Sequence, residues 1–329
     1  MLLNTYRMES KAVTFSPFYG IKFISEPNYY SDKLFVLFQR PATENQLKFF
    51  DYFKNNIKQK TRTGMLIELD DDLFDIPKWN MAYDYYNKNR KHCIEMIKKA
   101  DGVSVSTEFL ARKVRKYNKN VVVNLNHLPK FIWGGSEPKI RNIHNKKPRI
   151  FWGGSANHFA LQNSGLSGGD FGDELINFIK KTTDVYQWVF LGAIPNELYD
   201  AKDKIEIHKW KTPLHYPNYL KNLNIDVGIA PLFDHDFNKS KSFIKALEYV
   251  AMGIPAVYSD IEPYKDMSYK AKTDDEMISL IEKLVSDPSL RYDVYSSDYK
   301  AVESHLFWEE NNNIEKYVNN MLSFFNFKL

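Results

Sequence analysis

The residues best suited to chemistry lie in one segment, FNKSKSFIKALEYVAMGIPAVYSDIEPY, which begins at Phe237. A helix over residues 239–252 would place Lys241, Lys245 and Glu248 at positions i, i+4 and i+7, on one stripe of its surface. Two ammonium groups and a carboxylate would then share one face. Lysines in such a place bind anions, and one carboxylate can accept hydrogen bonds from both hydroxyls of a vicinal diol.

The start of this helix adds to the predicted anion site. Asn238 or Ser240 can cap it, which leaves free backbone N–H groups and the positive end of the helix dipole close to Lys241 and Ser242. A diphosphate beside the two lysines and a ribose beside Glu248 together describe a nucleotide. The alternative is an ordinary amphipathic helix, with the lysines in solvent and the glutamate paired with a lysine.

The residues after the helix extend the pattern. Gly253-Ile254-Pro255 predicts a helix stop, and Ala256–Ser259 predicts a buried strand followed by a loop that contains Pro263. The whole pattern, F-N-x-x-K-S-x-x-K-x-L-E-Y-x-A-x-G-I-P followed by S-x-x-x-P-Y, resembles the donor-binding segment of GT-B glycosyltransferases of the large retaining group.

This resemblance implies roles for the charged residues. Glu248 would hold the ribose of a nucleotide-sugar donor, and Lys241, Ser242 and Lys245 would lie beside its diphosphate. Many members of the family have two glutamates eight positions apart here, the first near the transferred sugar, but this chain has Ser240 at that first position. The departure concerns the handling of the sugar and leaves the nucleotide-binding residues matched.

A glycine-rich turn is the second predicted donor contact. Gly153-Gly154-Ser155 follows the expected strand Arg149–Trp152, so its N–H groups could form an anion nest, with His158 three residues on. A related set of the same enzymes has Gly-Ser and a following histidine there, which implies contact with the diphosphate or the sugar. An isolated turn and a structural histidine are the alternatives. Trp210, after a later strand, would stack on the base or serve as a core or surface aromatic.

Three consecutive carboxylates, Asp70, Asp71 and Asp72, follow an expected strand. Each raises the pKa of the others, so the cluster needs a compensating partner. Arg40 or Arg62, a Mg²⁺ ion, or an acceptor hydroxyl that donates to a carboxylate acting as base would satisfy it. Capping of the next helix by an aspartate is the alternative. A metal-binding D-x-D motif is typical of the other glycosyltransferase fold, GT-A, and the donor segment argues against that fold.

The predicted site combines these segments. Its reaction would be transfer of a hexose or pentose with retention of configuration, as the resemblance implies. No metal is required in this scheme, because lysines and a helix start would neutralise the leaving diphosphate, and the co-substrate is a nucleotide-diphosphate sugar. The predicted catalytic residues are Asp70, Asp71, His158 and Lys245, and the predicted acceptor contacts are Arg40, Asp72 and Thr107. The predicted donor contacts are Gly153, Gly154, Ser155, Trp210, Lys241, Ser242, Lys245 and Glu248.

Alternating strands and helices must position these residues. Residues 149–259 alternate regularly, which predicts a parallel sheet wound with helices on both faces. The first half is less regular, with strands expected at 33–39, 65–69, 102–106 and 121–124 and helices at 44–58 and 83–99. The predicted fold class is α/β, with two Rossmann-like domains facing each other across a cleft, as in GT-B proteins.

The polar stretch Ser136–Lys147 is the expected linker between the domains. We predict an acceptor-binding domain over residues 1–137 and a nucleotide-sugar-binding domain over 148–305. Residues 306–329, with Trp308 and Tyr317 in the last helix, resemble the C-terminal helix that crosses back onto the N-terminal domain in GT-B proteins.

Length and composition bound the class of protein. The 329 residues suffice for two domains, and 43% hydrophobic and 26% charged residues are typical of a globular protein. The single cysteine, Cys93, excludes an intrachain disulfide framework. No apolar run is long enough to cross a membrane, and the N-terminal segment MLLNTYRMESK lacks a signal-peptide core. We therefore predict a cytoplasmic protein without membrane insertion.

Charge is unevenly distributed along the chain. Residues 1–130 contain 22 Lys and Arg against 14 Asp and Glu, although the net charge of the whole chain is +4. The basic half favours a polyanionic acceptor, and the chain resembles small phage-type enzymes that glycosylate hydroxymethylated DNA bases flipped from the stack. DNA is therefore the expected acceptor partner. Glycans and lipid-linked saccharides are the rival acceptors, and ordinary scatter in charge is the alternative explanation.

Two interpretations belong to other classes of protein. A nucleotide-sugar epimerase or binding protein would keep the fold without using an acceptor, and Ser240 in place of the first glutamate is its main support. A DNA-binding module without catalysis would bind DNA independently of Lys245 and Glu248.

Overall fold

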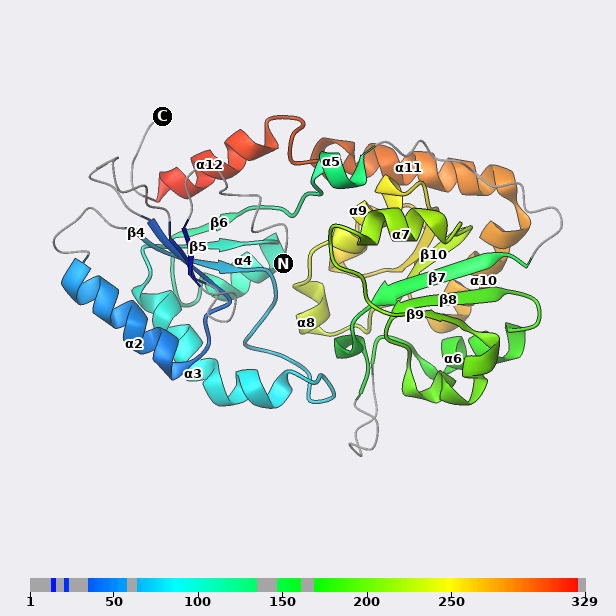
Figure 1. Cartoon of the computed structure of the whole chain (residues 1–329), viewed down its shortest axis with the longest axis horizontal. Coiled ribbons are helices and arrows are strands. Elements are labelled where there is room, and N and C mark those ends of the chain that lie inside the picture. The colour runs from blue at the N-terminus through cyan, green and yellow to red at the C-terminus, as the bar shows by residue number, and fades with distance from the viewer. Residues whose placement is uncertain are drawn as a thin grey trace.

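The computed structural model of the chain describes residues 13–15, 21–23, 35–57, 64–134, 147–160 and 169–324. These residues form two α/β lobes that lie side by side, each built around its own β-sheet (Figure 1). The expected linker up to residue 146, the alternative cation Arg62 and the segment MLLNTYRMESK lie outside the described residues. No helix within the described ranges has the length and apolar character to span a bilayer.

The sheet of the first lobe has the strand order β1-β2-β3-β4-β5-β6. Strands β3 to β6 are parallel, whereas β1 and β2 extend the sheet in antiparallel register and have no counterpart among the predicted elements. Every residue of β4 is buried, as expected when both faces of a parallel sheet are covered. The strands are β1 (Val13–Phe15), β2 (Ile21–Phe23), β3 (Phe35–Gln39), β4 (Gly64–Leu69), β5 (Gly102–Val105) and β6 (Val121–Val123).

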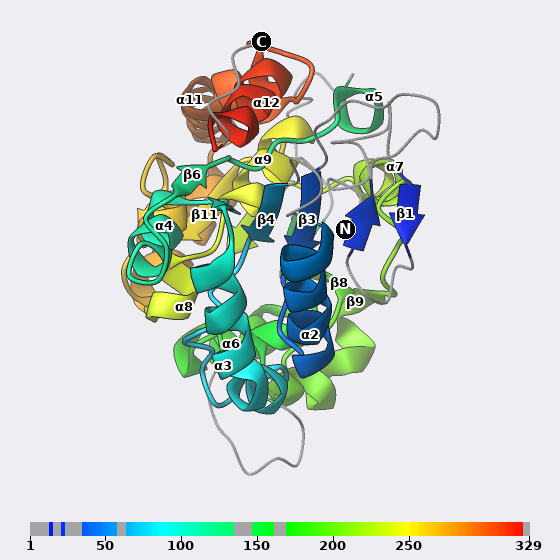
Figure 2. The same ribbon diagram turned by 90° about the vertical axis from the view of Figure 1, so that its left-hand side faces the viewer.

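The helices of the first lobe largely follow the predicted pattern. α3 (Tyr83–Lys99) has the predicted bounds, and Figure 2 shows it beside α2 (Glu44–Tyr52). The helix predicted over 44–58 is α-helical only to Tyr52, because the chain continues as a π-helical turn, η1 (Phe53–Ile57). The short helix α4 (Glu108–Val114) completes the lobe, whereas α5 (Lys130–Trp133) packs against the second lobe, where Trp133 belongs to the core cluster and contacts Tyr216.

The sheet of the second lobe is parallel throughout, as predicted, with the strand order β12-β11-β10-β7-β8-β9. Its strands are β7 (Arg149–Gly154), β8 (Gln187–Gly192), β9 (Glu206–His208), β10 (Val227–Ala230), β11 (Ala256–Ser259) and β12 (Lys270–Ala271). Short 3₁₀ turns, η2 (Ala156–His158), η3 (Asn196–Lys204) and η4 (Glu262–Tyr264), follow three of the strands.

Alternate side chains of the central strands pack on opposite faces of this sheet. Trp152 and Phe190 share one core cluster with α6 (Asp173–Thr182) and α10 (Asp274–Ser286). Phe151 and Leu191 belong to the other cluster, with α7 (Tyr216–Asn222), α9 (Ile244–Ala251) and α11 (Pro288–Leu306). The period of two along the strands therefore buries both faces, which is the doubly wound arrangement.

The chain returns to the first lobe at its C-terminal end. α11 lies over the second lobe and α12 (Asn313–Ser323) over the first (Figure 1). Asn320 of α12 donates hydrogen bonds to the Val123 carbonyl at 3.3 Å and to Asn124 Oδ1 at 2.8 Å, at the end of β6. Tyr317 is in α12, but Trp308 lies in the turn before it, because α11 ends at Leu306.

Candidate functional site

A cleft of about 560 Å³ lies between the lobes and collects most of the predicted site residues. From the first lobe it is lined by Arg40, Asp70 and Asp71, at the C-terminal ends of β3 and β4. From the second lobe it is lined by Gly154, Ser155, His158, Trp210, Lys241, Ser242, Lys245 and Glu248. Ligands of open α/β sheets bind at such strand ends.

The donor segment is not one continuous helix, which corrects the prediction. α8 (Asp236–Lys239) ends at Ser240, and α9 begins only at Ile244. The Ser240 carbonyl accepts a hydrogen bond from Thr107 Oγ1 of the first lobe at 3.0 Å, where a continuous helix would bond it to the Ile244 N–H. The two predicted capping residues therefore do not cap α9. Lys241 and Ser242 lie in the connection between the helices.

Lys245 and Glu248 nevertheless share one face of α9 and both line the cleft. Lys245 Nζ donates to the carbonyl of Gly153 and lies 3.5 Å from Glu248 Oε2. Burial raises the pKa of Glu248, and Lys245 opposes this rise. The glutamate is therefore paired with a lysine, as the alternative interpretation expected. The pair does not lie on a solvated helix face, however, because it lines the cleft and only 17% of the Lys245 side chain and 18% of the Glu248 side chain are exposed.

Tyr216 is a site residue that the sequence does not indicate. Its hydroxyl donates to Glu248 Oε2 at 3.4 Å, and its ring stacks on Trp210 with 6.0 Å between centroids and an angle of 22°. Burial, with Glu248 nearby, raises the pKa of the Tyr216 phenol well above its usual value. Trp210 lines the cleft but is 60% exposed, so its outer face is open. A tyrosine in a helix carries no signal that it faces a glutamate 32 residues further on.

The glycine pair also differs from the prediction. Gly153 and Gly154 are the last two residues of β7 and pair with Leu191 and Gly192 of β8, so they do not form a nest after the strand. Gly192 has φ +104°, and a Cβ there would collide with the Gly154 carbonyl, which explains why β8 ends in glycine. Ser155 lies at the start of the turn that follows β7, and it lines the cleft.

His158 is held by a buried carboxylate, Asp170, which the sequence does not single out. His158 Nδ1 lies 2.6 Å from Asp170 Oδ2, and the carboxylate is fully buried. Burial and the nearby Lys241 lower the pKa of His158. Burial would raise the pKa of Asp170, but Lys241, His158 and the Phe233 N–H hold it below its usual value.

The aspartate cluster is compensated by Arg40, one of the predicted partners. Arg40 bonds to Asp70, and its Nη2 lies 2.6 Å from Asp71 Oδ2. The residue adopts a left-handed backbone with φ 45°, which is uncommon for arginine. Burial raises the pKa of Asp71, and Arg40 opposes this rise. In the described ranges no three His, Cys, Asp or Glu side chains come together as metal ligands would.

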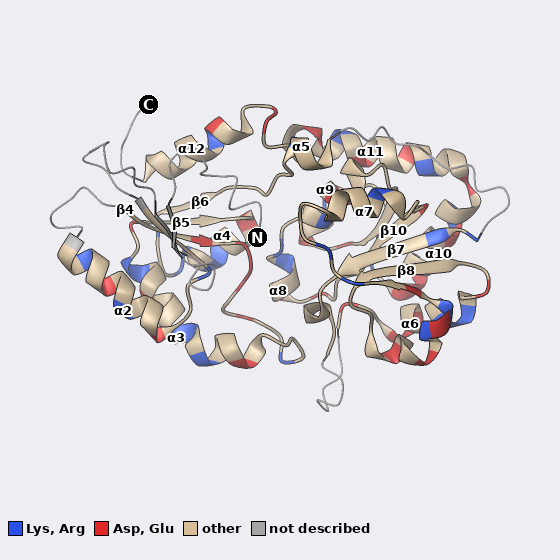
Figure 3. Cartoon of the chain, in the orientation of Figure 1, with Lys and Arg blue, Asp and Glu red and all other residues tan. Residues whose placement is uncertain are grey.

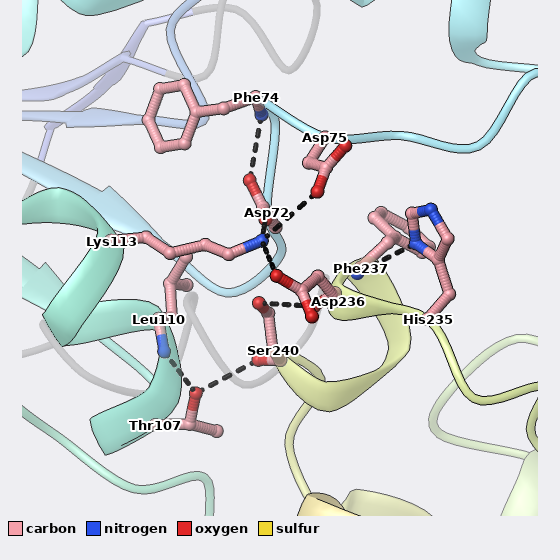
Figure 4. A network of polar contacts seen from close by, with 10 residues as sticks. All are labelled: Asp72, Phe74, Asp75, Thr107, Leu110, Lys113, His235, Asp236, Phe237 and Ser240. Carbon is pink, nitrogen blue, oxygen red and sulfur yellow. Dashed lines mark hydrogen bonds and ion pairs between the residues drawn. The ribbon is translucent and has the colours of Figure 1, made fainter.

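Asp72 lies outside the cleft lining, in a network between the lobes (Figure 4). Lys113 of α4 donates to its Oδ2 at 2.6 Å and lies 3.4 Å from both Asp75 and Asp236, the latter in the second lobe. Asp72 Oδ1 accepts the Phe74 N–H at 2.9 Å, so it caps a turn and not a helix. With no exposed surface, Asp72 is placed to hold Lys113 and not to meet a ligand.

Thr107 belongs to the same network and is likewise absent from the cleft lining. Its hydroxyl accepts the Leu110 N–H at 3.2 Å, which caps α4, and donates to Ser240 across the interface (Figure 4). Two further bonds join the lobes at the cleft: Asn126 donates to Ser242 Oγ at 2.8 Å, and Asn80 donates to the Asn157 carbonyl at 3.0 Å.

No family model matches the sequence, and no curated protein matches it. Solved structures do match the fold. A mutant of S. aureus TarM, in a complex containing UDP, has 15% identity and a TM-score of 0.50 over 84% of this chain and 54% of its own. The α,α-trehalose 6-phosphate synthase of Burkholderia multivorans has 10% identity and a TM-score of 0.54 over 87% and 71%. Anabaena Alr3699/HepE, in complex with UDP and glucose, has 10% identity and a TM-score of 0.53 over 80% and 72%.

The chain spans only about half the length of the TarM mutant chain. At such low identities the likeness concerns the arrangement of the elements and not the chemistry. Two facing α/β lobes with parallel sheets are shared with these structures. The chain therefore has the fold of the GT-B glycosyltransferases, which confirms the predicted fold class.

Proposed function

We propose that the chain is a glycosyltransferase that moves a sugar from a nucleotide-diphosphate donor to a hydroxyl acceptor. The main support for this proposal is that charged residues of both lobes line one cleft. Lys245 and Glu248 lie on one wall, and Asp71 with its partner Arg40 lies on the other. Because two of the similar structures hold UDP, a UDP-sugar is the first donor to test.

The second lobe would bind the donor. Glu248 would accept hydrogen bonds from the ribose hydroxyls, and Lys241 and Lys245 would neutralise the diphosphate without a required metal. Trp210 would stack on the base with its open face. The Gly154–Ser155 turn would lie beside the diphosphate or the sugar.

The first lobe would place the acceptor hydroxyl. Asp71, oriented by Arg40, would accept a hydrogen bond from that hydroxyl, with Asp70 as its neighbour. The acceptor oxygen then bonds to the anomeric carbon as the bond from that carbon to the diphosphate oxygen breaks. The hydroxyl proton passes to the Asp71 carboxylate, the diphosphate leaves with the electron pair of the broken bond, and the configuration is retained. In this proposal residues 1–137 form the acceptor domain, 148–305 the donor domain, and 306–329 the crossing segment.

The charge of the cleft wall favours a neutral acceptor, such as a saccharide, over DNA. Arg40 is the one cation that the described first lobe contributes to the cleft, and it is already paired with two aspartates. The other basic residues of this lobe lie largely along the helices, as on α2 and α3 (Figure 3). A duplex bound through its phosphates needs several unpaired cations at the site. DNA glycosylation stays a prediction, and nothing in the described residues supports it.

The donor test is a thermal-shift screen of UDP, ADP, GDP and their sugars, because a ligand of the native state raises its melting temperature. We expect a response to one nucleotide, and a loss of about ten- to hundredfold in its affinity in Lys245→Met. Lys239→Met is the matched control, since Lys239 pairs with Asp234 and does not line the cleft. If no nucleotide binds, the proposal is wrong.

The acceptor test then uses the donor so identified. Faster release of nucleotide with a saccharide panel would support a saccharide acceptor. Release that depends on hydroxymethylated DNA, with an affinity that falls steeply with salt, would support DNA instead. An altered sugar in the absence of any acceptor would identify an epimerase and overturn the proposal of transfer.

A further inference from the structure

The hydrogen bonds around Asp170 determine which ring nitrogen of His158 is free to bind a ligand. The identity of that ligand rests on the proposed function, in which the cleft binds a nucleotide sugar. The side chain of Asp170 is fully buried, and four groups surround its two oxygens. Oδ1 accepts the Phe233 N–H at 3.0 Å and an Asn238 Nδ2 proton at 2.6 Å. Oδ2 faces His158 Nδ1 at 2.6 Å and Lys241 Nζ at 3.7 Å.

Every neighbour of this carboxylate is a donor or a cation. The Phe233 N–H can only donate, and the second proton of Asn238 Nδ2 is used by the Phe233 carbonyl at 2.9 Å. With Lys241 beside it, Asp170 stays ionised and can only accept. The proton between the two side chains must therefore sit on His158 Nδ1.

The second ring nitrogen follows from the first. A neutral imidazole with its proton on Nδ1 has a bare lone pair on Nε2. Lys241 and burial both disfavour the imidazolium, so the neutral form is the one present at neutral pH. Among the described residues none is recorded as a hydrogen-bond partner of Nε2, and His158 lines the cleft.

We propose that Asp170 is a positioning residue that holds His158 in the Nδ1–H tautomer, so that Nε2 accepts a hydrogen bond from a sugar or acceptor hydroxyl in the cleft. The assignment excludes the diphosphate as the partner of His158, because a bare ring nitrogen repels a phosphate oxygen. It also explains the asparagine of the donor motif, since Asn238 serves Asp170 and has no cleft contact.

The tautomer can be read directly from ¹⁵N chemical shifts of labelled histidine in the free protein, with His158→Gln to assign the signal. We expect a neutral ring protonated on Nδ1 in the wild type. In Asp170→Asn the amide oxygen must stay on the side of the Phe233 N–H, so the amide NH₂ faces His158 and the proton should move to Nε2. Asp173→Asn, an exposed position outside the network, should leave the wild-type signal unchanged.

A wild-type ring protonated on Nε2, or on both nitrogens at neutral pH, would overturn the proposal. This result needs no ligand, so it is distinct from a failure of nucleotide binding, which would overturn the proposed function alone. Should Asp170→Asn not fold, the wild-type spectrum still decides the matter.

The partner of Nε2 is identified with His158→Ala. We expect the affinity for UDP alone to change less than about threefold and transfer to fall about ten- to hundredfold. A parallel loss of affinity for the UDP-sugar places the bond on the donor sugar, whereas a rise in KM for the acceptor alone places it on the acceptor hydroxyl. A tenfold loss for UDP itself would show contact with the diphosphate and contradict the proposal.

Discussion

Glu248 lies beside a lysine and a tyrosine on the wall of the cleft. Removal of solvent raises the pKa of this carboxyl, and the Lys245 ammonium favours the ionised form that a ribose would need. A carboxylate with two acceptor oxygens can bind both hydroxyls of a ribose, but only one hydroxyl of a 2′-deoxyribose. The geometry therefore predicts a preference for a ribonucleotide over a 2′-deoxyribonucleotide.

We predict that the wild type binds UDP about tenfold more tightly than 2′-deoxy-UDP, since one charge-assisted hydrogen bond contributes about 1.5 kcal/mol or more. Glu248→Ala should weaken UDP binding and bring the two affinities within about twofold of each other. Isothermal titration calorimetry with both nucleotides measures this difference. If the variant keeps the wild-type preference, Glu248 does not bind the ribose.

Arg40 has an unusual backbone conformation and also orients the carboxylates of the cleft wall. Its left-handed conformation is disfavoured for a residue with a side chain, by about 1–2 kcal/mol. Its guanidinium contacts with Asp70 and Asp71, and its N–H bond to the Glu68 carbonyl at 2.9 Å, hold it there. The carboxylates of this wall are thus fixed before a ligand arrives.

At the scale of elements, α4 and α8 meet through the Lys113 ammonium, which lies among three carboxylates. Asp72 depends on it most, because that side chain is fully buried. Lys113→Ala would leave a buried carboxylate without its cation, although the Phe74 N–H would still donate to it.

We expect Lys113→Ala to lower the free energy of unfolding by about 2–3 kcal/mol, measured by urea denaturation. Lys116→Ala, at an exposed position just beyond the same helix, is the control and should stay within about 0.5 kcal/mol of the wild type. An equal effect of both substitutions would show that the ion pair contributes nothing specific.

A second element contact responds to pH. Asp298 of α11 accepts hydrogen bonds from the N–H and the hydroxyl of Ser268, both at 2.7 Å. Burial raises the pKa of Asp298 to about 6, and the bonds from Ser268 oppose the rise. Because the folded-state pKa exceeds that of the unfolded chain, this group adds stability at acidic pH and loses it as the pH rises through about 6.

Between pH 4 and pH 8 the wild type should therefore lose about 2 kcal/mol of unfolding free energy that Asp298→Asn does not lose. The asparagine keeps an acceptor oxygen for Ser268 but does not ionise. Urea denaturation at both pH values tests this, with the exposed Asp293→Asn on the same helix as control. Identical pH dependence in Asp298→Asn and wild type would contradict it.

At the scale of the whole molecule, the lobes have separate hydrophobic cores. One cluster fills the first lobe, and two clusters cover the faces of the second sheet. The proposed nucleotide contacts, such as Lys245 and Glu248, belong to the second lobe. A nucleotide should therefore stabilise one lobe more than the other.

Calorimetry should show a calorimetric enthalpy larger than the van't Hoff enthalpy, as for two units that do not unfold together. UDP at about a hundred times its Kd should move the transition of the second lobe up by about 5 °C or more. Glu248→Ala should reduce that shift. A single two-state transition would show that the interlobe bonds couple the lobes fully.

Local patterns were enough to predict much of the architecture. The alternation of strands and helices predicted the parallel sheet of the second lobe, and α3 has the predicted bounds, because hydrophobic periodicity and helix-forming residues act over short distances. Lys245 and Glu248 share a face for the same reason, being three residues apart on one helix. These features are properties of neighbouring residues, so the sequence by itself determined them.

Other features depend on segments that are far apart in the chain. The helix predicted over 239–252 breaks where Thr107, 133 residues earlier, bonds to Ser240. Asp170 and Tyr216 became site residues only when folding brought them to His158 and Glu248. Asp72 forms an ion pair with Lys113 and does not line the cleft. Hydrogen bonds and ion pairs between distant segments carry no periodic signal, so only the tertiary structure decided them.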